Sequence, residues 1–263
     1  MKIRFFAGLL AGLIMVSGCS TAPLTGRRQL KLVSDSVMIA QSATGYKEVI
    51  DEGPLSSDPR QTEMVKRVGD RIAAAVENYF AQQNQSALLE GFAWEFNLIE
   101  KDEINAWCMP GGKVAFYTGI LPYTRDELGV AVVMGHEIAH AVAGHSAERV
   151  SQQLLQQGGG LILSQFSKES KNYEAIMALY SIGSEVGVIL PYSRTHELEA
   201  DRLGLIFMAM AGYDPNAAVG FWTRMSEISG GKTPEFLSTH PSDASRIEGI
   251  QSCLPEALQY YKP

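Results

Sequence analysis

One short stretch, Met134 to Ser146, constrains the fold of this chain most, because it places ionisable side chains inside an apolar segment. It reads MGHEIAHAVAGHS and follows TRDELGVAVV. Thr124 with Glu127 three residues later predicts a helix that begins there, and its nearly all-apolar first turns are typical of a buried helix. Polar side chains on a buried helix need partners. The rest of the chain must therefore bring compensating groups to this helix.

Two histidines of this stretch are spaced to share one metal ion. His136 and His140 are four residues apart, so on a helix they lie about 6 Å apart along the axis and roughly 40° apart around it. Both imidazoles can then reach one zinc ion, while Glu137 turns away from the metal and can reach a water beside it, as a general base does. His145 lies five residues past His140, so we expect it to be structural or solvent-facing and not a ligand.

A catalytic zinc needs a third protein ligand, and two patterns could supply it. After HEIAH, the residues AVAGHS depart from the HExxHxxGxxH spacing, in which the third ligand is a histidine. The alternative takes a glutamate from a later helix, and SRTHELEADRLG offers Glu197, Glu199 and Asp201. Glu197 and Asp201 are one turn apart on one face, whereas we expect Glu199 to point elsewhere.

HEIAH followed by SRTHELEAD resembles peptidase family forty-eight of the metallopeptidases, which includes HtpX, the CAAX prenyl proteases, the mitochondrial Oma protease, BepA and LoiP. The resemblance implies a gluzincin core with one zinc ion per chain and Glu197 as the third ligand. It also implies that Asp201, the last residue of an E-x-x-x-D motif, orients a ligand histidine, His136. Glu199 occupies a variable place in that motif. The resemblance covers most of the chain, from about Ser34 onward.

Two further segments resemble the same family. NAWCMPGGKVAFYTG is similar to its N-A-x-x-x-P-G-G segment, which Asn105 opens, and the resemblance implies that the next strand, with Val114, is a sheet edge where an extended substrate pairs. The alternative is a hairpin that only packs. STHPSDASRI places His240 where BepA-like members hold a histidine near the zinc. His240 then either ligates and closes the site, or stabilises the oxyanion, or is simply a loop histidine.

The first eighteen residues differ in character from the rest. MKIR is basic, and FFAGLLAGLIMV is an apolar run too short for a comfortable membrane span but right for a signal peptide. The run ends in VSGC, which resembles a bacterial lipobox and implies cleavage before Cys19, acylation of its thiol and a membrane anchor. Ser20 then implies the periplasmic side of the outer membrane. We expect a signal peptide over 1–18, a lipidated tether over 19–34 and one metallopeptidase domain over 35–263.

The remaining segments predict an α+β domain that is mostly α, with a small β-sheet. DPRQTEMVKRVGDRIAAAVENYF is amphipathic with Asp58 as its N-cap, while FAWEFNLIE and KVAFYTG alternate as strands do. SRTHELEADRLGLIFMAMAG predicts a helix that begins after Ser193 and stops at Gly212. Residues 151–190 predict two helices around a glycine-rich segment, which either packs in the core or forms a mobile flap over a cleft.

The net charge of the chain bears on its binding partners, and its cysteines bear on a possible disulfide. The net charge of -7 argues against a nucleic-acid partner, whose phosphates need a basic surface. Cys108 and Cys253 are either a disulfide or two separate thiols.

The favoured hypothesis is a lipid-anchored zinc metalloendopeptidase that acts on protein substrates, which for family members are misfolded envelope proteins. In this hypothesis Glu137 is the base and His240 is a possible gate. The rivals are a latent chaperone-like or binding lipoprotein with a plugged zinc site, and a surface lipoprotein without metal. The sequence leaves the oligomeric state open.

Overall fold

The described strands all lie in the first half of the chain, together with two long helices, and the described part of the second half is helical. The structure, a computed structural model, describes residues 19–156, 193–228, 234–241 and 244–262. Its strands are β1 (Cys19–Thr21), β2 (Arg28–Leu30), β3 (Glu95–Ile99), β4 (Ala106–Met109) and β5 (Lys113–Tyr117). Its α-helices are α2 (Asp35–Glu52), α3 (Pro59–Gln82), α4 (Leu121–Thr124), α5 (Glu127–Val142), α6 (His145–Gln156), α9 (Arg194–Met210), α10 (Ala217–Ser226), α11 (Glu235–Thr239) and α12 (Ala244–Ala257). The α+β class, mostly helical with small sheets, is confirmed.

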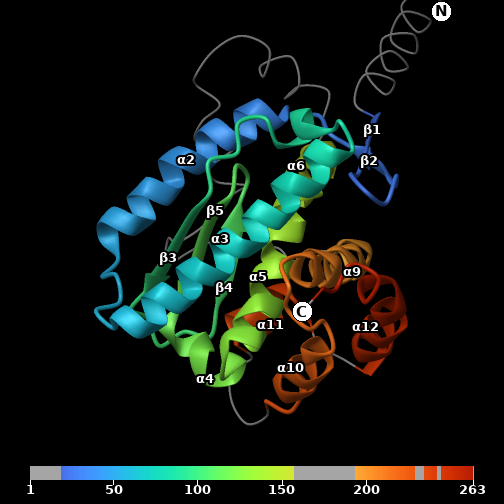
Figure 1. Cartoon of the computed structure of the whole chain (residues 1–263). Coiled ribbons are helices and arrows are strands. Elements are labelled where there is room, and N and C mark those ends of the chain that lie inside the picture. The colour runs from blue at the N-terminus through green and yellow to red at the C-terminus, as the bar shows by residue number, and fades with distance from the viewer. Residues whose placement is uncertain (1–18, 157–192, 229–233, 242–243, 263) are drawn as a thin grey trace, which may run out of the picture.

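Three strands form a small mixed sheet in the order β3-β5-β4, with β5 parallel to β3 and antiparallel to β4. Side chains alternate across it, as strand geometry requires. Phe96, Leu98 and Phe116 face the main core with α3, α5 and α9, while Ile99 and Tyr117 face a second core beneath α2. The sheet is therefore buried on both faces, and Figure 1 shows it in the same part of the molecule as α2 and α3.

The topology corrects the expectation for Val114. Its strand, β5, is the central strand and pairs with Phe96 on one side and Cys108 on the other, so Val114 lies at no edge and is fully buried. The edge beside β5 is β4, whose four residues AWCM show no polar alternation and were not predicted as a strand. Sequence periodicity could not detect β4, because both of its faces are covered.

Helix α3 forms where its sequence predicts it. The Asp58 side chain accepts hydrogen bonds from the backbone N–H groups of Arg60 and Gln61, and Pro59 takes the first helical position, where a missing N–H is harmless. Its buried residues recur at helical spacing: Val65, Val68, Ile72, Val76 and Phe80. The predicted capping residue is confirmed. The spacing predicted Val65, Val68, Ile72, Val76 and Tyr79 as the core face, and the structure buries the first four but Phe80 in place of Tyr79.

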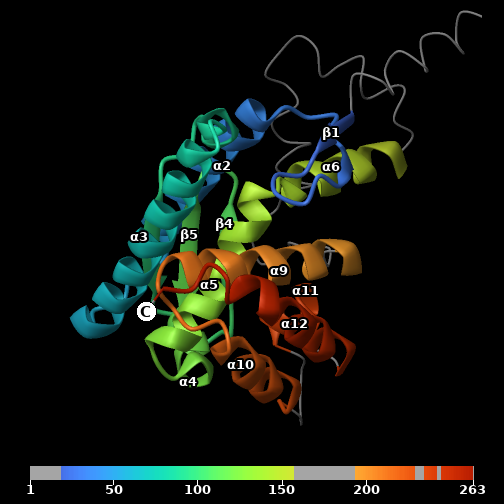
Figure 2. The ribbon, with the colours of Figure 1, turned by 45° about the vertical axis from the view of Figure 1, so that its right-hand side comes forward.

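Helices α5 and α9 cross in direct backbone contact. A Cβ on Gly135 would lie 2.7 Å from the carbonyl oxygen of Gly204, and a Cβ on Gly204 would lie 2.8 Å from the backbone nitrogen of His136. Only glycine permits this approach. The crossing places the histidine-bearing turns of α5 against the first turns of α9, and both views show α9 beside α12 on one side of α5 (Figures 1 and 2).

The segment 19–34 packs on the domain, which corrects its description as a tether. β1 and β2 pair antiparallel, with Cys19 opposite Leu30. Gln29 is buried and donates to the carbonyl oxygen of Ala143 at 2.6 Å. Polar contacts therefore hold this N-terminal hairpin, defined here as residues 19–30, against the end of α5. Within the described ranges, none of the helices combines the length and apolar character that a membrane crossing requires.

Several boundaries differ from the sequence predictions. Helix α5 begins at Glu127, because Asp126 is its N-cap and accepts from the N–H of Gly129, so the capping box predicted at Thr124 is wrong. Ser193 caps α9 and Gly212 follows its end with a positive φ, both as predicted. The predicted flap lies almost wholly outside the described residues. Cys108 and Cys253 are separate free thiols.

Candidate metal centre

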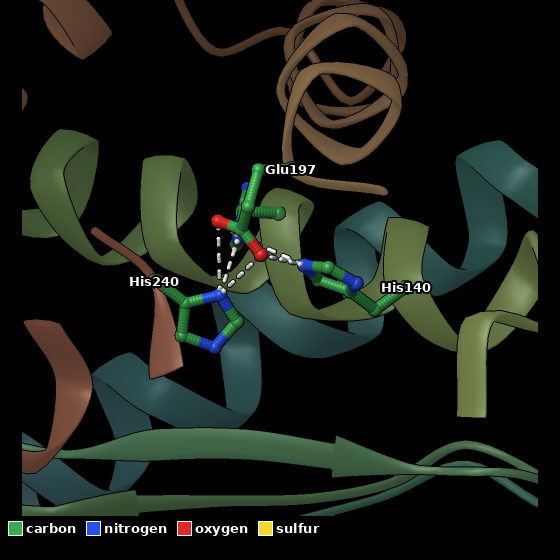
Figure 3. Close-up of side chains that lie close together, drawn as sticks. His140, Glu197 and His240 are labelled. Atoms are coloured by element: carbon green, nitrogen blue, oxygen red, sulfur yellow. Dashed lines mark hydrogen bonds and ion pairs between the residues drawn. The ribbon is translucent and has the colours of Figure 1, made fainter. Parts of the chain in front are cut away.

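Four ionisable side chains from distant parts of the chain meet in the interior. One ligand atom from each of His136, His140, Glu197 and His240 lies within 4.8 Å of all the others, and all four residues are buried. Helix α5 carries the first two, the first turn of α9 carries Glu197, and His240 follows the last residue of α11. Figure 3 shows the Glu197 carboxylate between the rings of His140 and His240.

Distances within the cluster suit a shared cation. Nε2 of His136 lies 3.0 Å from Nε2 of His140 and 3.1 Å from Nδ1 of His240. Glu197 Oε1 lies 3.0 Å from Nδ1 of His240 and 3.3 Å from Nε2 of His140. Three imidazole nitrogens and one carboxylate oxygen converge, which is the donor set that zinc prefers. The residues therefore fit a zinc ion.

Glu137 is a buried carboxylate beside this cluster. Its Oε1 has no hydrogen-bond partner among the described residues, although Nε2 of His240 lies 3.4 Å away. Burial raises the pKa of Glu137 to about 7, against the opposing pull of His240 and a backbone hydrogen bond from Cys108. A carboxyl group with a pKa near neutrality can both accept and return a proton.

Glu197 behaves differently, although it is also buried. Burial alone would raise the pKa of its carboxyl, but His240, His136 and His140 together hold that pKa well below its usual range. Glu197 is therefore an anion, as a metal ligand must be.

A carboxylate–arginine pair lies behind His136. Asp201 Oδ1 lies 3.0 Å from Nδ1 of His136. Arg246 donates to both oxygens of Asp201, at 2.9 and 2.8 Å, and its guanidinium lies over the Trp222 ring at 3.4 Å. The family resemblance implied the place of Asp201 behind His136, but no role was assigned to Arg246, although it lies within the STHPSDASRI segment quoted for His240.

A second polar group, made of His145 and Glu199, lies behind His140. His145 is fully buried and its Nδ1 lies 2.9 Å from Nδ1 of His140, so of its two expected places the structural one holds and the solvent-facing one is wrong. Glu199 points away from the ligand atoms of Glu197, as expected, and its Oε2 lies 3.0 Å from Nε2 of His145. Gly144, with φ of +70°, ends α5 and starts a new helix, so the helical angle counted from His140 does not apply. The signal that could have found His145 is its ionisable side chain close to the apolar segment of α5.

The edge strand β4 lies next to Glu137. The N–H of Tyr117 donates to the carbonyl oxygen of Asn105, so by antiparallel alternation the N–H and C=O groups of Ala106 and Cys108 point away from β5. No described strand pairs with that side. Asn105 is itself buried, and its side chain accepts from the N–H of Ala106 at 2.9 Å.

An apolar cavity of about 600 Å³ adjoins the cluster at His140. It lies between α2, the C-terminal end of α5, the 3₁₀ turn η1 (Ser86–Leu89) and the turn after β4. Most of its lining is apolar and includes Met38, Ile39, Leu88 and Phe92. An extended chain beside the free side of β4 would run toward this cavity, because Pro110 and Gly111 also line it.

Comparisons with known proteins agree with this geometry. The sequence model of Peptidase family M48 matches residues 59–254. The mitochondrial metalloendopeptidase OMA1 of Schizosaccharomyces pombe is 36% identical over 96% of this chain and 72% of its own length. The human mitochondrial metalloendopeptidase OMA1 is 29% identical over 98% of this chain and 51% of its own length. The beta-barrel assembly-enhancing protease of Yersinia pestis is 30% identical over 76% of this chain and 40% of its own length. The chain thus spans about half or less of the last two relatives.

Proposed function

The chain belongs to Peptidase family M48, whose members are zinc metallopeptidases, and from that premise we propose how its own residues divide the work of cleaving a peptide bond. His136, His140 and Glu197 hold one zinc ion, and Asp201 orients His136. A bound zinc ion supplies a Lewis acid that polarises a carbonyl oxygen and makes water acidic. The convergence of these ligand atoms within 4.8 Å carries the proposal.

Glu137 acts as the general base in this proposal. Its buried Oε1, with no hydrogen-bond partner among the described residues, can take a proton from the attacking water, and its pKa of about 7 lets it deliver that proton to the leaving amine. Glu137→Gln should keep about one zinc ion per chain and abolish cleavage of an unfolded protein substrate. Cleavage by pure Glu137→Gln protein at the wild-type rate would refute this role.

His240 gates the site in this proposal. Its Nδ1 lies 3.0 Å from Glu197 and its Nε2 lies 3.4 Å from Glu137, so its ring occupies the space beside both the ligand and the base. His240→Ala should raise basal cleavage if the ring closes the site. A fall in cleavage with unchanged zinc content would instead assign His240 to oxyanion stabilisation, the alternative role.

The substrate is an extended protein segment. The backbone C=O groups of Ala106 and Cys108 support this, because they lie on the side of β4 that no described strand pairs with and can accept main-chain hydrogen bonds from a strand beside Glu137. The apolar cavity beside His140 accepts an apolar side chain that flanks the cleaved bond. Leu88→Glu, at an exposed lining position, should shift cleavage-site preference in a peptide library from apolar toward basic residues. Leu258→Glu, exposed elsewhere, is the control and should leave the preference unchanged.

Location and substrate source follow from the N-terminal sequence. The VSGC segment supports acylation of Cys19 and a lipid anchor on the periplasmic side of the outer membrane. Misfolded envelope proteins are then the accessible substrates, in line with the name of the Yersinia relative, a beta-barrel assembly-enhancing protease. Metabolic labelling with a palmitate analogue tests the anchor, since label should enter wild type and be lost in Cys19→Ser. A comparison of cleavage products between wild-type and Glu137→Gln cells identifies the substrates.

The rival function is a binding lipoprotein whose zinc site stays plugged by His240. One observation favours it, namely that His240 lies within ligand distance in the cluster. The same unfolded substrate discriminates the two. If His240→Ala protein holds zinc and still cleaves nothing, the binding function is favoured over the protease.

A further inference from the structure

The two histidines of α5 are supported in different ways. Nδ1 of His136 faces a carboxylate oxygen of Asp201 at 3.0 Å, the ordinary arrangement behind a metal ligand. Nδ1 of His140 faces another imidazole nitrogen, Nδ1 of His145, at 2.9 Å. Behind His140 the carboxylate therefore contacts the second imidazole and not the first: Nε2 of His145 lies 3.0 Å from Glu199 Oε2.

The order of these contacts fixes where each proton sits. If Nε2 of His140 binds a metal, its Nδ1 carries the ring proton and acts as a donor. The facing Nδ1 of His145 must then accept, so the proton of His145 sits on Nε2. That Nε2–H needs an acceptor, and the carboxylate of Glu199 is one. Each donor in the series therefore meets an acceptor only in one tautomeric arrangement.

Glu199 is held in place by the N-terminal hairpin. Arg27 Nε donates to Glu199 Oε2 at 2.6 Å, and the Thr25 hydroxyl donates to Oε1 of the same carboxylate. The remaining nitrogens of Arg27 donate to Glu148 at 3.0 and 2.7 Å. Glu148 in turn lies 3.0 Å from Nε2 of His196, the neighbour of the ligand Glu197. One guanidinium from residues 19–30 thus joins α6 and α9 behind the metal centre.

We propose that Arg27, Glu199 and His145 form a positioning relay that presents Nε2 of His140 to the metal, so that the N-terminal hairpin completes the zinc site. This inference rests on the proposed zinc binding but not on proteolysis. The relay parallels Arg246 and Asp201 behind His136, with an arginine holding a carboxylate in each case. The competing explanation is an ion cluster that only fastens the hairpin to the domain. It predicts the same loss of stability on mutation but no effect on the metal ligand.

Histidine tautomers in the zinc-loaded wild-type chain provide the first test. Long-range ¹H–¹⁵N correlation spectra distinguish protonated from unprotonated ring nitrogens. We expect the proton of His140 on Nδ1 and that of His145 on Nε2. A proton on Nδ1 of His145 in zinc-loaded protein would overturn the relay, and this outcome depends on no substitution.

Zinc affinity, measured by competition with a chromophoric chelator, provides the second test. Loss of a group that orients a metal ligand typically weakens metal binding by about 10–100-fold. We expect Glu199→Gln and Arg27→Gln to raise the zinc dissociation constant within that range. Arg27→Lys, which keeps the charge without the forked geometry, should fall between Arg27→Gln and wild type. Arg67→Gln is the matched control. It removes the two hydrogen bonds that Arg67 of α3 donates to Glu127, which lies on α5 as His140 does. This variant should bind zinc like wild type.

The outcomes separate this inference from the proposed function. Zinc dissociation constants within twofold of wild type in both Gln variants would refute the relay, whatever their stability. The visible spectrum of cobalt-substituted protein should also change in Glu199→Gln, since the orientation of His140 changes. A chain that shows the expected tautomers and affinities but cleaves no protein would support the relay and contradict the protease.

Discussion

Replacing Gly204 by alanine should separate α5 from α9 and damage the metal centre more than the fold. An added Cβ would lie 2.8 Å from the backbone nitrogen of His136 and 2.9 Å from both its Cα and the carbonyl carbon of Gly135. These are backbone atoms, so no rotation of a side chain relieves the contact. Ordinary contact begins at 3.4 Å, so the helices must move apart by about 0.6 Å.

The magnitudes favour a metal defect over a folding defect. Overpacking of this kind costs about 1–3 kcal/mol, and alanine returns up to about 1 kcal/mol through its better helix propensity. The free energy of unfolding should therefore fall by no more than about 3 kcal/mol. Metal–ligand distances are held to about ±0.2 Å, so a shift of about 0.6 Å between His136 and Glu197 exceeds what the site tolerates. We expect the zinc dissociation constant to rise by about tenfold or more.

Chelator competition measures the zinc dissociation constant, and urea unfolding of the metal-free protein measures the fold. Gly220→Ala is the matched control, because its added Cβ in α10 would meet nothing closer than an Arg224 side-chain nitrogen at 3.4 Å. It should leave zinc binding unchanged and stabilise the chain slightly. Wild-type zinc affinity in folded Gly204→Ala protein would refute the claim that backbone contact at this crossing sets the site.

Three further predictions concern stability. The Tyr46 hydroxyl donates to the buried carbonyl oxygen of Val114 at 2.8 Å, and Tyr46→Phe removes this donor. Urea unfolding should show a free energy of unfolding lower by about 1–3 kcal/mol. An unchanged free energy would show that water replaces the hydroxyl. Burial raises the pKa of Glu148, but hydrogen bonds from His196 and Arg27 outweigh it and bring that pKa to about 2. Because this folded pKa lies below the usual 4.5, the stability that Glu148 contributes is complete above about pH 4.5 and is lost as the pH falls toward 2. Glu148→Gln should therefore make the free energy of unfolding depend less on pH in that window. An unaltered dependence on pH would contradict this role of Glu148. Removal of zinc should lower the unfolding temperature, and zinc in hundredfold excess over its dissociation constant should restore about 2.7 kcal/mol, while equal melting with and without zinc would contradict the site.

The sequence predicted the parts of this molecule that depend on local pattern. The spacing of His136, Glu137 and His140 in the sequence predicts their place, because helix geometry alone puts the two imidazoles together. Helix geometry places Glu197 and Asp201 on one face of a second helix, but their roles as ligand and as orienting group came from the resemblance to the family. The amphipathic helix α3 was predicted from its cap and its period, and both are local properties.

Other parts depend on tertiary contacts that periodicity does not encode. β4 was missed because a short strand covered on both faces shows no alternation. The contact of His145 with His140 was missed because Gly144 breaks the helix on which the angle of His145 was counted. Arg27 was assigned to a tether, since nothing in the sequence around it shows that its partners lie more than a hundred residues away. These residues support the site through contacts between segments that are distant in the sequence or separated by a break in a helix, and only the folded chain reveals such contacts.

The most direct test of the central claim is a zinc titration of the metal-free protein, with cleavage of an unfolded protein as the readout. Among the residues that the structure describes, one set of ligand atoms comes together, from His136, His140, Glu197 and His240. Cleavage should therefore be absent without metal, rise in proportion to added zinc and reach its plateau at one equivalent per chain. Cleavage that persists at full rate in chelator-treated, metal-free protein would contradict the account.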